Sequence, residues 1–585
     1  MSGAFRRGER WRYAWPAGLT ALVAGLLPLA AAAQPGTFIP QASPIPHMLA
    51  PETPSVGGLP AAPQPAAPTA VPATEVAVTS VAIEGATVYP PERLVSFTTG
   101  LVGPTIKLAR IEAARVALLN LYRGDGYVLS TVSASLDETG RLRFLVLEGR
   151  ISDVKLDGEI GPAGVQVLRF LRHLTEKAPI DEATLERWLL LAQDIPGVSL
   201  HAVLRPSAET PGAMTLVAQV SRSAVSGLFT ADNYAFRATG PEEYLGAIDF
   251  NSFTSLGERT ELSLYQGNAG TQTFGQASEE FYVGDSGLRV RVYGGAGIAT
   301  PSGELRAIGY QDLIDLGGLS ATYPVLRSRQ QSLTLGAYFD VEQMEILTNS
   351  GVGGSSARAS FDALRVFRFG ADYARQDLLL GGDRVALNTA NARVSQGIPG
   401  LDGTSNANPF PGRLGERVDF TKVNAEITRT QTLFQPWSDA TVAFKGLVLG
   451  QYTNDVLPPF EEFYLGGPNY TRGYFWGEAF GDRALAATAE LDLNESLDVR
   501  VFGHSLPLAA QFYVFYDWGE TWDVTRGDPH AVLRSAGVGT RLDLTQYVEF
   551  DVIGAERFSR TPFGTAGGLR PLSADAIYWQ VLAHF

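Results

Sequence analysis

The 585-residue sequence predicts a multidomain protein in which two small α+β units precede a transmembrane antiparallel β-barrel of about sixteen strands. From residue 221 to the C-terminus, apolar and polar residues alternate through successive short runs, as they do in β-strands. Residues 76–220 instead carry a strand and helix pattern that repeats after about 70 residues. Beyond the N-terminus no run approaches the roughly 18 to 20 apolar residues that a spanning helix requires, so strands must do any spanning.

Residues 221–585 are expected to form the barrel. At roughly 22 residues for a strand and its connection, this length accommodates about sixteen strands, an even number. The runs 288–293 and 333–342 alternate clearly, and their polar face is too extensive to be the outer face of a soluble sheet. The apolar face therefore meets lipid. The Gly-rich and Asn-rich connections are expected to be extracellular loops, at residues 351–354 and 406–409.

The N-terminus predicts an exported protein. Within residues 1–33, four arginines precede a short apolar stretch that ends in Ala30-Ala31-Ala32-Ala33, which is typical of a signal peptide. A retained anchor helix is the alternative. Residues 34–75 contain a proline every few residues and predict an extended periplasmic linker, with a Pro-rich docking motif as the alternative.

Composition argues against several classes of function. The chain has no cysteine, so its stability must come from a large core or a closed barrel. A formal net charge of -15 argues against nucleic-acid binding, which needs clustered basic residues. The six histidines show no ligand spacing, and neither a phosphate loop nor a Gly-x-Ser-x-Gly elbow is present. We therefore expect no catalytic site, no metal and no cofactor.

The two α+β units are expected at residues 76–149 and 150–220. The first has a β-like run at 76–84, a helical period at 106–122, and strands at 128–136 and 142–147. The second repeats this order, with strands and helices expected at 151–158, 163–175, 180–194, 198–204 and 214–220.

One loop, residues 465–482, stands out from the strands around it. It contains Arg472-Gly473-Tyr474, in which one arginine lies among aromatic residues in a membrane barrel, where an unpaired guanidinium is costly. A carboxylate partner is therefore expected. Asp517 is the candidate, because in the strand-like run 511–519 it points away from Val514, Tyr516 and Trp518.

Two motifs together resemble a known family. Leu465-Gly466-Gly467 followed by Arg472-Gly473-Tyr474, and Phe515-x-Asp517-x-Gly519, are similar to those of outer-membrane secretion barrels with periplasmic POTRA domains. The closest resemblance is to two-partner secretion transporters of the haemolysin and filamentous-haemagglutinin secretion-activation type. Tyr122-x-x-x-Gly126-Tyr127 and Leu147-Glu148-Gly149-Arg150-Ile151 resemble POTRA sequences.

The resemblance implies that the Arg472 loop folds back into the barrel and meets Asp517 on the lumen wall as a pore or gating loop. It also implies two POTRA domains, as in these transporters. The Pro-rich linker departs from the family, in which an N-terminal helix commonly plugs the barrel, so a plug is not expected here. The C-terminal strand, with Trp579 and the terminal Phe585, resembles the signal by which the barrel-assembly machinery recognises its substrates.

These features predict an outer-membrane transporter of a Gram-negative bacterium, with its POTRA domains in the periplasm. It would secrete an unfolded partner protein by type V, two-partner secretion, and the partner would be a large β-helical adhesin or haemolysin. The remaining partners expected are outer-membrane lipid and, during biogenesis, the barrel-assembly machinery. The main alternative is a barrel-assembly or insertion factor. A porin would not need residues 76–220, and an outer-membrane enzyme would need a catalytic constellation.

Overall fold

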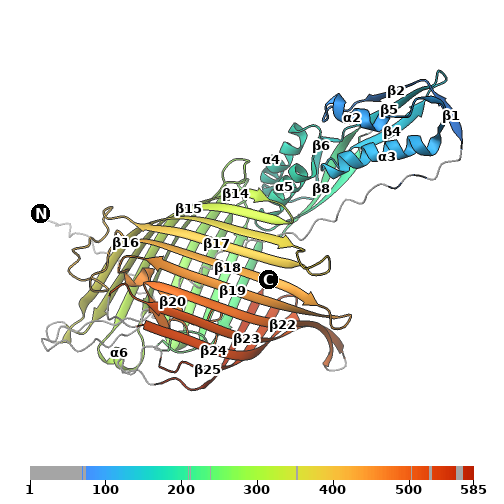
Figure 1. Cartoon of the computed structure of the whole chain (residues 1–585). Helices are drawn as coiled ribbons and strands as arrows, with labels where there is room; N and C mark the ends of the chain where they lie inside the picture. The colour runs from blue at the N-terminus through green and yellow to red at the C-terminus, as the bar shows by residue number, and fades with distance from the viewer. Residues whose placement is uncertain are drawn as a thin grey trace, which may run out of the picture.

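A computed structural model of the protein contains two α+β units beside one end of a β-barrel (Figure 1). The structure describes residues 67, 69, 74–207, 210, 212–237, 239–350, 354–501, 504–525, 530–561 and 571–585. The signal peptide expected at 1–33 and residues 34–66 of the expected linker lie outside the described residues. Within the described part of the chain, no helix is long and apolar enough to cross a bilayer.

The first unit is built around Tyr122, which is fully buried between helices and sheet. Its three-stranded sheet has the order β2-β5-β4, with β2 and β5 parallel, and β1 pairs with β3 alongside. The elements are β1 (Glu75–Val78), β2 (Ser80–Glu84), α2 (Pro91–Thr98), β3 (Gly103–Lys107), α3 (Leu108–Gly124), β4 (Thr131–Leu136) and β5 (Arg141–Leu147).

Two boundaries in this unit differ from the sequence prediction. The helix expected from Ile106 begins at Leu108, because Ile106 pairs with Val76 in the β3–β1 ladder. The strand expected from Val128 begins at Thr131, since residues 127–130 form a turn in which Ser130 N–H donates to Tyr127 O at 3.1 Å. Long-range pairing and turn formation override local periodicity at both places.

The second unit has the same plan. Its sheet order is β6-β8-β7, with β6 and β8 parallel and β7 antiparallel to β8. On α4, Val167, Phe170, Leu171 and Leu174 recur at helical spacing and are completely buried against that sheet. The elements are β6 (Arg150–Asp157), α4 (Ala163–Glu176), α5 (Glu182–Gln193), β7 (Val198–Pro206) and β8 (Ala213–Arg222).

The described barrel strands number sixteen, and the barrel closes through pairing of β26 with β9. The predicted antiparallel barrel of about sixteen strands is therefore confirmed. All neighbouring pairs are antiparallel. The strands are β9 (Val225–Asp232), β10 (Glu243–Asn251), β11 (Arg259–Gly267), β12 (Gln272–Tyr282), β13 (Arg289–Ala299), β14 (Gln311–Arg327), β15 (Gln331–Thr348), β16 (Ala357–Asp377), β17 (Ala386–Gly397), β18 (Thr421–Phe434), β19 (Ala440–Thr453), β22 (Arg483–Val501), β23 (His504–Trp522), β24 (His530–Thr545), β25 (Val548–Arg557) and β26 (Asp575–His584).

The two faces of the barrel wall have different chemistry. On β23, Val514 is 51% exposed and Tyr516 is 46% exposed. Phe515, which lies between them, and Asp517, which follows Tyr516, are buried. The same alternation leaves Phe369 on β16 and Ile427 on β18 exposed on the outside. A continuous apolar exterior of this kind needs lipid around it, so the polar residues line the lumen.

The second unit is docked on the barrel end from which β9 starts (Figure 1). Tyr282, at the end of β12, packs into the core of this unit and donates through its hydroxyl to Asp194 O at 3.1 Å. Arg327, at the end of β14, binds both carboxylate oxygens of Asp194 at 2.7 Å. Because the strands alternate in direction, the connection 398–420 lies at the opposite end of the barrel from the second unit. This connection includes residues 406–409, which were expected to form an extracellular loop. Of the other expected loop, residues 351–353 lie outside the described part of the chain.

Candidate functional site: a pore loop anchored in the lumen

The connection between β19 and β22 turns into the barrel instead of projecting from it. It contains the short helix η3 (Pro459–Glu461) and a two-stranded ribbon of β20 (Phe463–Leu465) with β21 (Ala479–Gly481). Leu465, Tyr474 and Ala479 are fully buried against lumen-facing side chains of the barrel strands. We call residues 465–482, which run from the last residue of β20 through β21 to Asp482, the pore loop.

Arg472 lies at the centre of the contacts between the pore loop and the wall. Its Nε and Nη2 donate to the two oxygens of Asp517 on β23 at 3.0 and 2.9 Å, and its backbone N–H donates to Asp517 at 2.8 Å. Its third guanidinium nitrogen binds Glu490 on β22. Arg472 and both carboxylates are almost completely buried, so the ionic contacts are sheltered from water.

An aromatic residue completes the Arg472 site. The guanidinium carbon lies 4.0 Å from the centre of the Phe515 ring, which shares the lumen face of β23 with Asp517. The face of an aromatic ring attracts a cation, and a guanidinium stacks well on it. Phe515 and Asp517, two residues apart on one strand, therefore hold one arginine by two different interactions.

Gly473 and Tyr474 continue the contact onto the next strands. A Cβ on Gly473 would lie 2.5 Å from the Ser535 Cβ on β24, so only glycine lets the backbone approach this closely. Gly473 O accepts hydrogen bonds from Arg557 and, at 3.2 Å, from the Tyr578 hydroxyl. The Tyr474 hydroxyl donates to Arg534 O at 2.6 Å.

The supporting motif residues shape the same loop. Gly466 and Gly467 have φ of 110° and 85°, values that side chains other than glycine rarely adopt, and Gly467 N–H donates to Tyr474 O at 3.0 Å. A Cβ on Gly519 would lie 2.8 Å from a methyl group of Leu465. The structure therefore brings every residue of the two motifs into one contact region.

Sequence reasoning missed other charged residues that hold the loop and its flanks. Glu490 accepts from Arg541 at 3.0 Å as well as from Arg472. Glu478 binds Arg237 at 2.6 Å, and Arg413 binds Asp482 at 2.6 Å. The alternating pattern of the strands could have indicated which charges face the lumen, but not which loop residue each of them meets.

Three carboxylates lie close together near Arg413. Oxygens of Glu462, Asp482 and Asp523 lie within 4.8 Å of one another. Arg413 lies among them, at 3.1 Å from Glu462, 2.6 Å from Asp482 and 3.1 Å from Asp523. The Arg413 guanidinium offsets part of this negative charge. It also links the 398–420 connection to Asp482, just before β22, and to Asp523, just after β23.

The C-terminal residues lie at the barrel seam. Phe585 is 68% exposed on the outer face, and its backbone N–H donates to Gly227 O on β9 at 3.1 Å. Trp579 is half-buried, and its backbone N–H donates to the side-chain oxygen of Asn233 at 2.8 Å. Trp579 therefore lies in β26, the strand that closes the barrel, and Phe585 directly follows that strand.

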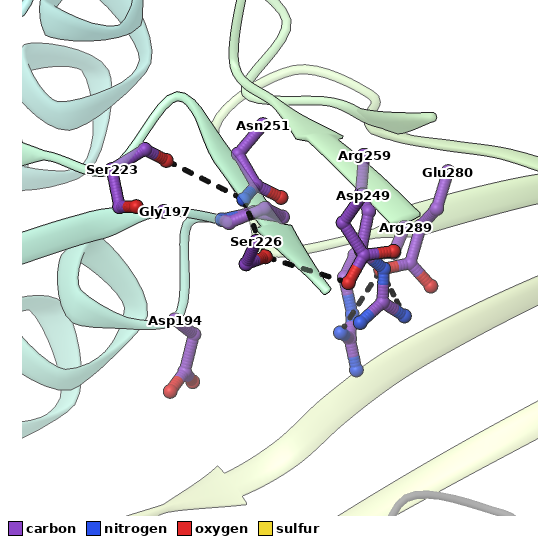
Figure 2. A pocket seen from close by; sticks show the side chains of 10 residues that line it. Asp194, Gly197, Ser223, Ser226, Asp249, Asn251, Arg259, Glu280 and Arg289 are labelled. Carbon is purple, nitrogen blue, oxygen red and sulfur yellow. Dashed lines mark hydrogen bonds and ion pairs between the residues drawn. The ribbon is translucent and has the colours of Figure 1, made fainter. Parts of the chain in front are cut away.

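A cavity of about 220 Å³ lies where the second unit meets the barrel (Figure 2). Asp194 and Gly197 of the second unit line one side, and the barrel strands contribute a mixed set of polar and charged side chains: Ser226, Asp249, Asn251, Arg259, Glu280 and Arg289. Within this lining, Asn251 donates to Ser226 at 2.9 Å and Arg289 to Glu280 at 3.3 Å. The end of the barrel that adjoins the second unit thus presents polar and charged side chains to this cavity.

Comparisons with known proteins agree with this architecture. Residues 318–542 match the family model of the haemolysin secretion/activation protein ShlB/FhaC/HecB, and residues 76–149 match the model of the ShlB-type POTRA domain. No curated protein sequence matches the chain.

Two solved structures have a similar fold over nearly the whole chain. CdiB from Escherichia coli superposes with a TM-score of 0.68 at 16% identity, covering 91% of this chain and 94% of that one. CdiB from Acinetobacter baumannii superposes with a TM-score of 0.57 at 15% identity, covering 92% of this chain and 95% of that one.

The fold and the family matches together define an outer-membrane β-barrel with POTRA-type domains in the periplasm. The chain belongs to the ShlB/FhaC/HecB family of secretion/activation proteins, the outer-membrane transporters of two-partner secretion. Its partner is therefore a secreted protein.

Proposed function

We propose that this transporter captures its unfolded partner in the periplasm through the two α+β units and passes it outward through the barrel as an extended chain. The observation that carries the proposal is the pore loop, fixed by Arg472 to Asp517 and Glu490 inside a closed sixteen-stranded barrel. A barrel of this size encloses an aqueous channel, and a loop held inside it by specific contacts controls passage.

The periplasmic units offer strand edges to an extended polypeptide. β4 is the edge of the β2-β5-β4 sheet and is exposed along most of its length, and β6 is an edge of the β6-β8-β7 sheet. Main-chain pairing at such an edge requires no particular side-chain sequence. On the proposed path, the partner would next meet the polar cavity that the second unit and the barrel strands line together.

The free energy for export would come from the partner itself. No nucleotide is needed if each segment folds as it emerges, because folding outside prevents its return. A large β-helical adhesin or haemolysin suits this scheme, since it can fold segment by segment. The activity is transport and not catalysis, and a net charge of -15 disfavours a nucleic-acid cargo. Outer-membrane lipid surrounds the barrel, and the barrel-assembly machinery would insert it by its C-terminal strand, with Trp579 and Phe585.

The decisive experiment compares cells with and without this protein. Proteins in the medium and on the cell surface are quantified together with the outer-membrane protein profile. We expect a single large exported protein to disappear from outside while other barrels persist. A general decline of outer-membrane barrels would overturn the proposal and indicate a barrel-assembly factor.

A further inference from the structure

The segment that enters the pore loop is held by a separate set of charges. Glu461, at the end of η3, has a side chain that is only 1% exposed. It accepts from Arg368 on β16 at 2.8 and 3.1 Å and forms an ion pair with Lys422 on β18 at 2.7 Å. Lys422 also donates to the backbone oxygen of Glu461 at 2.8 Å. This set is eleven residues before Arg472 and on a different part of the barrel wall.

We propose that Glu461 is the releasable anchor of the pore loop: it leaves Arg368 and Lys422 when the channel opens, while Arg472 stays bound to Asp517 and Glu490. This inference rests on the proposed function of the loop as the element that controls passage. The inference follows from the net charge that would remain on the barrel wall after each anchor is released.

At the Glu461 anchor, the wall is balanced without the loop. Arg368 also binds Asp340 and Glu342 on β15, each at 2.6 Å. When Glu461 leaves, two cations and two carboxylates remain, with no net charge. When the neighbouring Glu462 leaves, Arg413 keeps Asp482 and Asp523 as partners, and the net charge of this group falls in magnitude from -2 to -1. Release of the segment Pro459–Glu462 therefore brings both charge groups on the wall closer to neutrality.

At the Arg472 anchor, the wall is not balanced. Removing the arginine leaves Asp517, Glu490 and Asp551 with Arg541, which binds Glu490 at 3.0 Å and Asp551 at 3.2 Å. The group keeps a net charge of -2. Buried carboxylates without a compensating cation are strongly unfavourable, so this anchor resists release. The two anchors thus differ in the free-energy cost of release.

A lumen ion pair that touches no pore-loop residue provides the matched control. Arg393 on β17 binds both oxygens of Asp372 on β16 at 2.8 and 2.7 Å, and both side chains are partly buried, as Arg368 is. The variants Glu461→Gln and Asp372→Asn each replace one carboxylate by an amide of the same size. A difference between them isolates the effect of the loop anchor from a general loss of lumen charge pairing.

The test measures single-channel currents of the purified full-length protein in planar lipid bilayers. We expect Glu461→Gln to raise the frequency of open events at least threefold over wild type and Asp372→Asn to leave it unchanged. Lys422→Gln removes one of the two cations that bind Glu461 and should also raise the frequency of open events. This variant replaces Glu461→Gln in the test if Glu461→Gln does not yield a folded barrel. Equal behaviour of the Glu461 and Asp372 variants would overturn the inference.

A labelling experiment asks which of the two anchors is released. The chain has no cysteine, so single replacements at Phe460, next to Glu461, and at Thr471, next to Arg472, report on each anchor separately. In the Glu461→Gln protein, a membrane-impermeant maleimide should label Phe460→Cys faster than in the parent, with Thr471→Cys unchanged. Faster labelling at Thr471 would contradict the proposal. If no variant conducts ions, the pore itself, and with it the proposed function, fails instead.

Discussion

Arg472 in the pore loop binds both carboxylate oxygens of Asp517 on β23, at 2.9 and 3.0 Å, forty-five residues along the chain. The contact joins a connection that could have projected from the barrel to the wall of the lumen. Its burial makes it sensitive to substitution of Arg472, because loss of the arginine would remove the charge that compensates the buried carboxylate of Asp517.

Replacing Arg472 by Ala should impair secretion while the barrel remains assembled. Breaking one side of such a buried pair costs roughly 3–5 kcal/mol, which loosens the loop, whereas the sixteen-strand ladder does not depend on it. Secretion of the partner and the heat-modifiable migration of the folded barrel are measured in parallel. Arg472→Lys should restore little, since an ammonium cannot bind both oxygens side by side. Normal secretion by the Ala variant would contradict the assigned role.

Gly473→Ala should displace the loop by collision with Ser535, because the added Cβ would lie 2.5 Å from the Ser535 Cβ. The second substitution Ser535→Gly removes the opposing atoms, so the double variant should recover secretion and wild-type channel currents. The recovery is specific to steric contact between these two positions. If the double variant is as impaired as the single one, the close approach of the loop to β24 is not the cause.

Arg327→Ala should loosen the second unit from the barrel. Arg327 binds Asp194 at 2.7 Å through two nitrogens, and charge-assisted hydrogen bonds of this kind contribute roughly 1.5–3 kcal/mol. Hydrogen exchange of residues 150–222 in the full-length protein should increase. Arg329→Ala is the matched control, since Arg329 is 48% exposed and lies 4.0 Å from Glu186. Equal exchange in both variants would show that the Asp194 contact does not hold the unit.

Glu148 should make the first unit sensitive to acid. Burial by itself raises the pKa of Glu148, but hydrogen bonds from Thr87, Val88 N–H and the Tyr122 hydroxyl outweigh it, and the pKa lies below its ordinary value. A carboxylate with a lowered pKa stabilises the folded state above its ordinary pKa, and this contribution is lost as the pH falls through the lowered value.

The measurement is hydrogen exchange of residues 76–149 between pH 6 and pH 3, corrected for intrinsic exchange rates. Protection should decline below about pH 4.5, the ordinary pKa of the group. Glu148→Gln should lower protection at pH 6 and flatten the decline. Part of the decline should persist in this variant, because the hydrogen bond with Arg115 lowers the pKa of Glu112 to about 2. An unchanged pH profile in Glu148→Gln would exclude Glu148 as the cause.

Much of the candidate site could be predicted from local sequence. The need of Arg472 for a carboxylate followed from the cost of an isolated charge among apolar residues, and the two-residue period of β23 placed Asp517 on the lumen face. Contacts such as Glu461 with Arg368 could not be predicted, because the partners are 93 residues apart and the strand pattern does not specify which loop residue a lumen-facing side chain meets.

The sequence by itself determined the sixteen strands, the repeated α+β plan and the polar lumen, because the periods of 2 and 3.6 residues and the apolar exterior are local properties of the chain. Only the tertiary structure decided that Tyr282 at the end of a barrel strand joins the core of the second unit, and that Ile106 pairs in a strand instead of starting a helix. It also decided which charges hold the pore loop. Ion pairs and strand pairings depend on which distant segments are brought together when the barrel closes, and local periodicity carries no information about that.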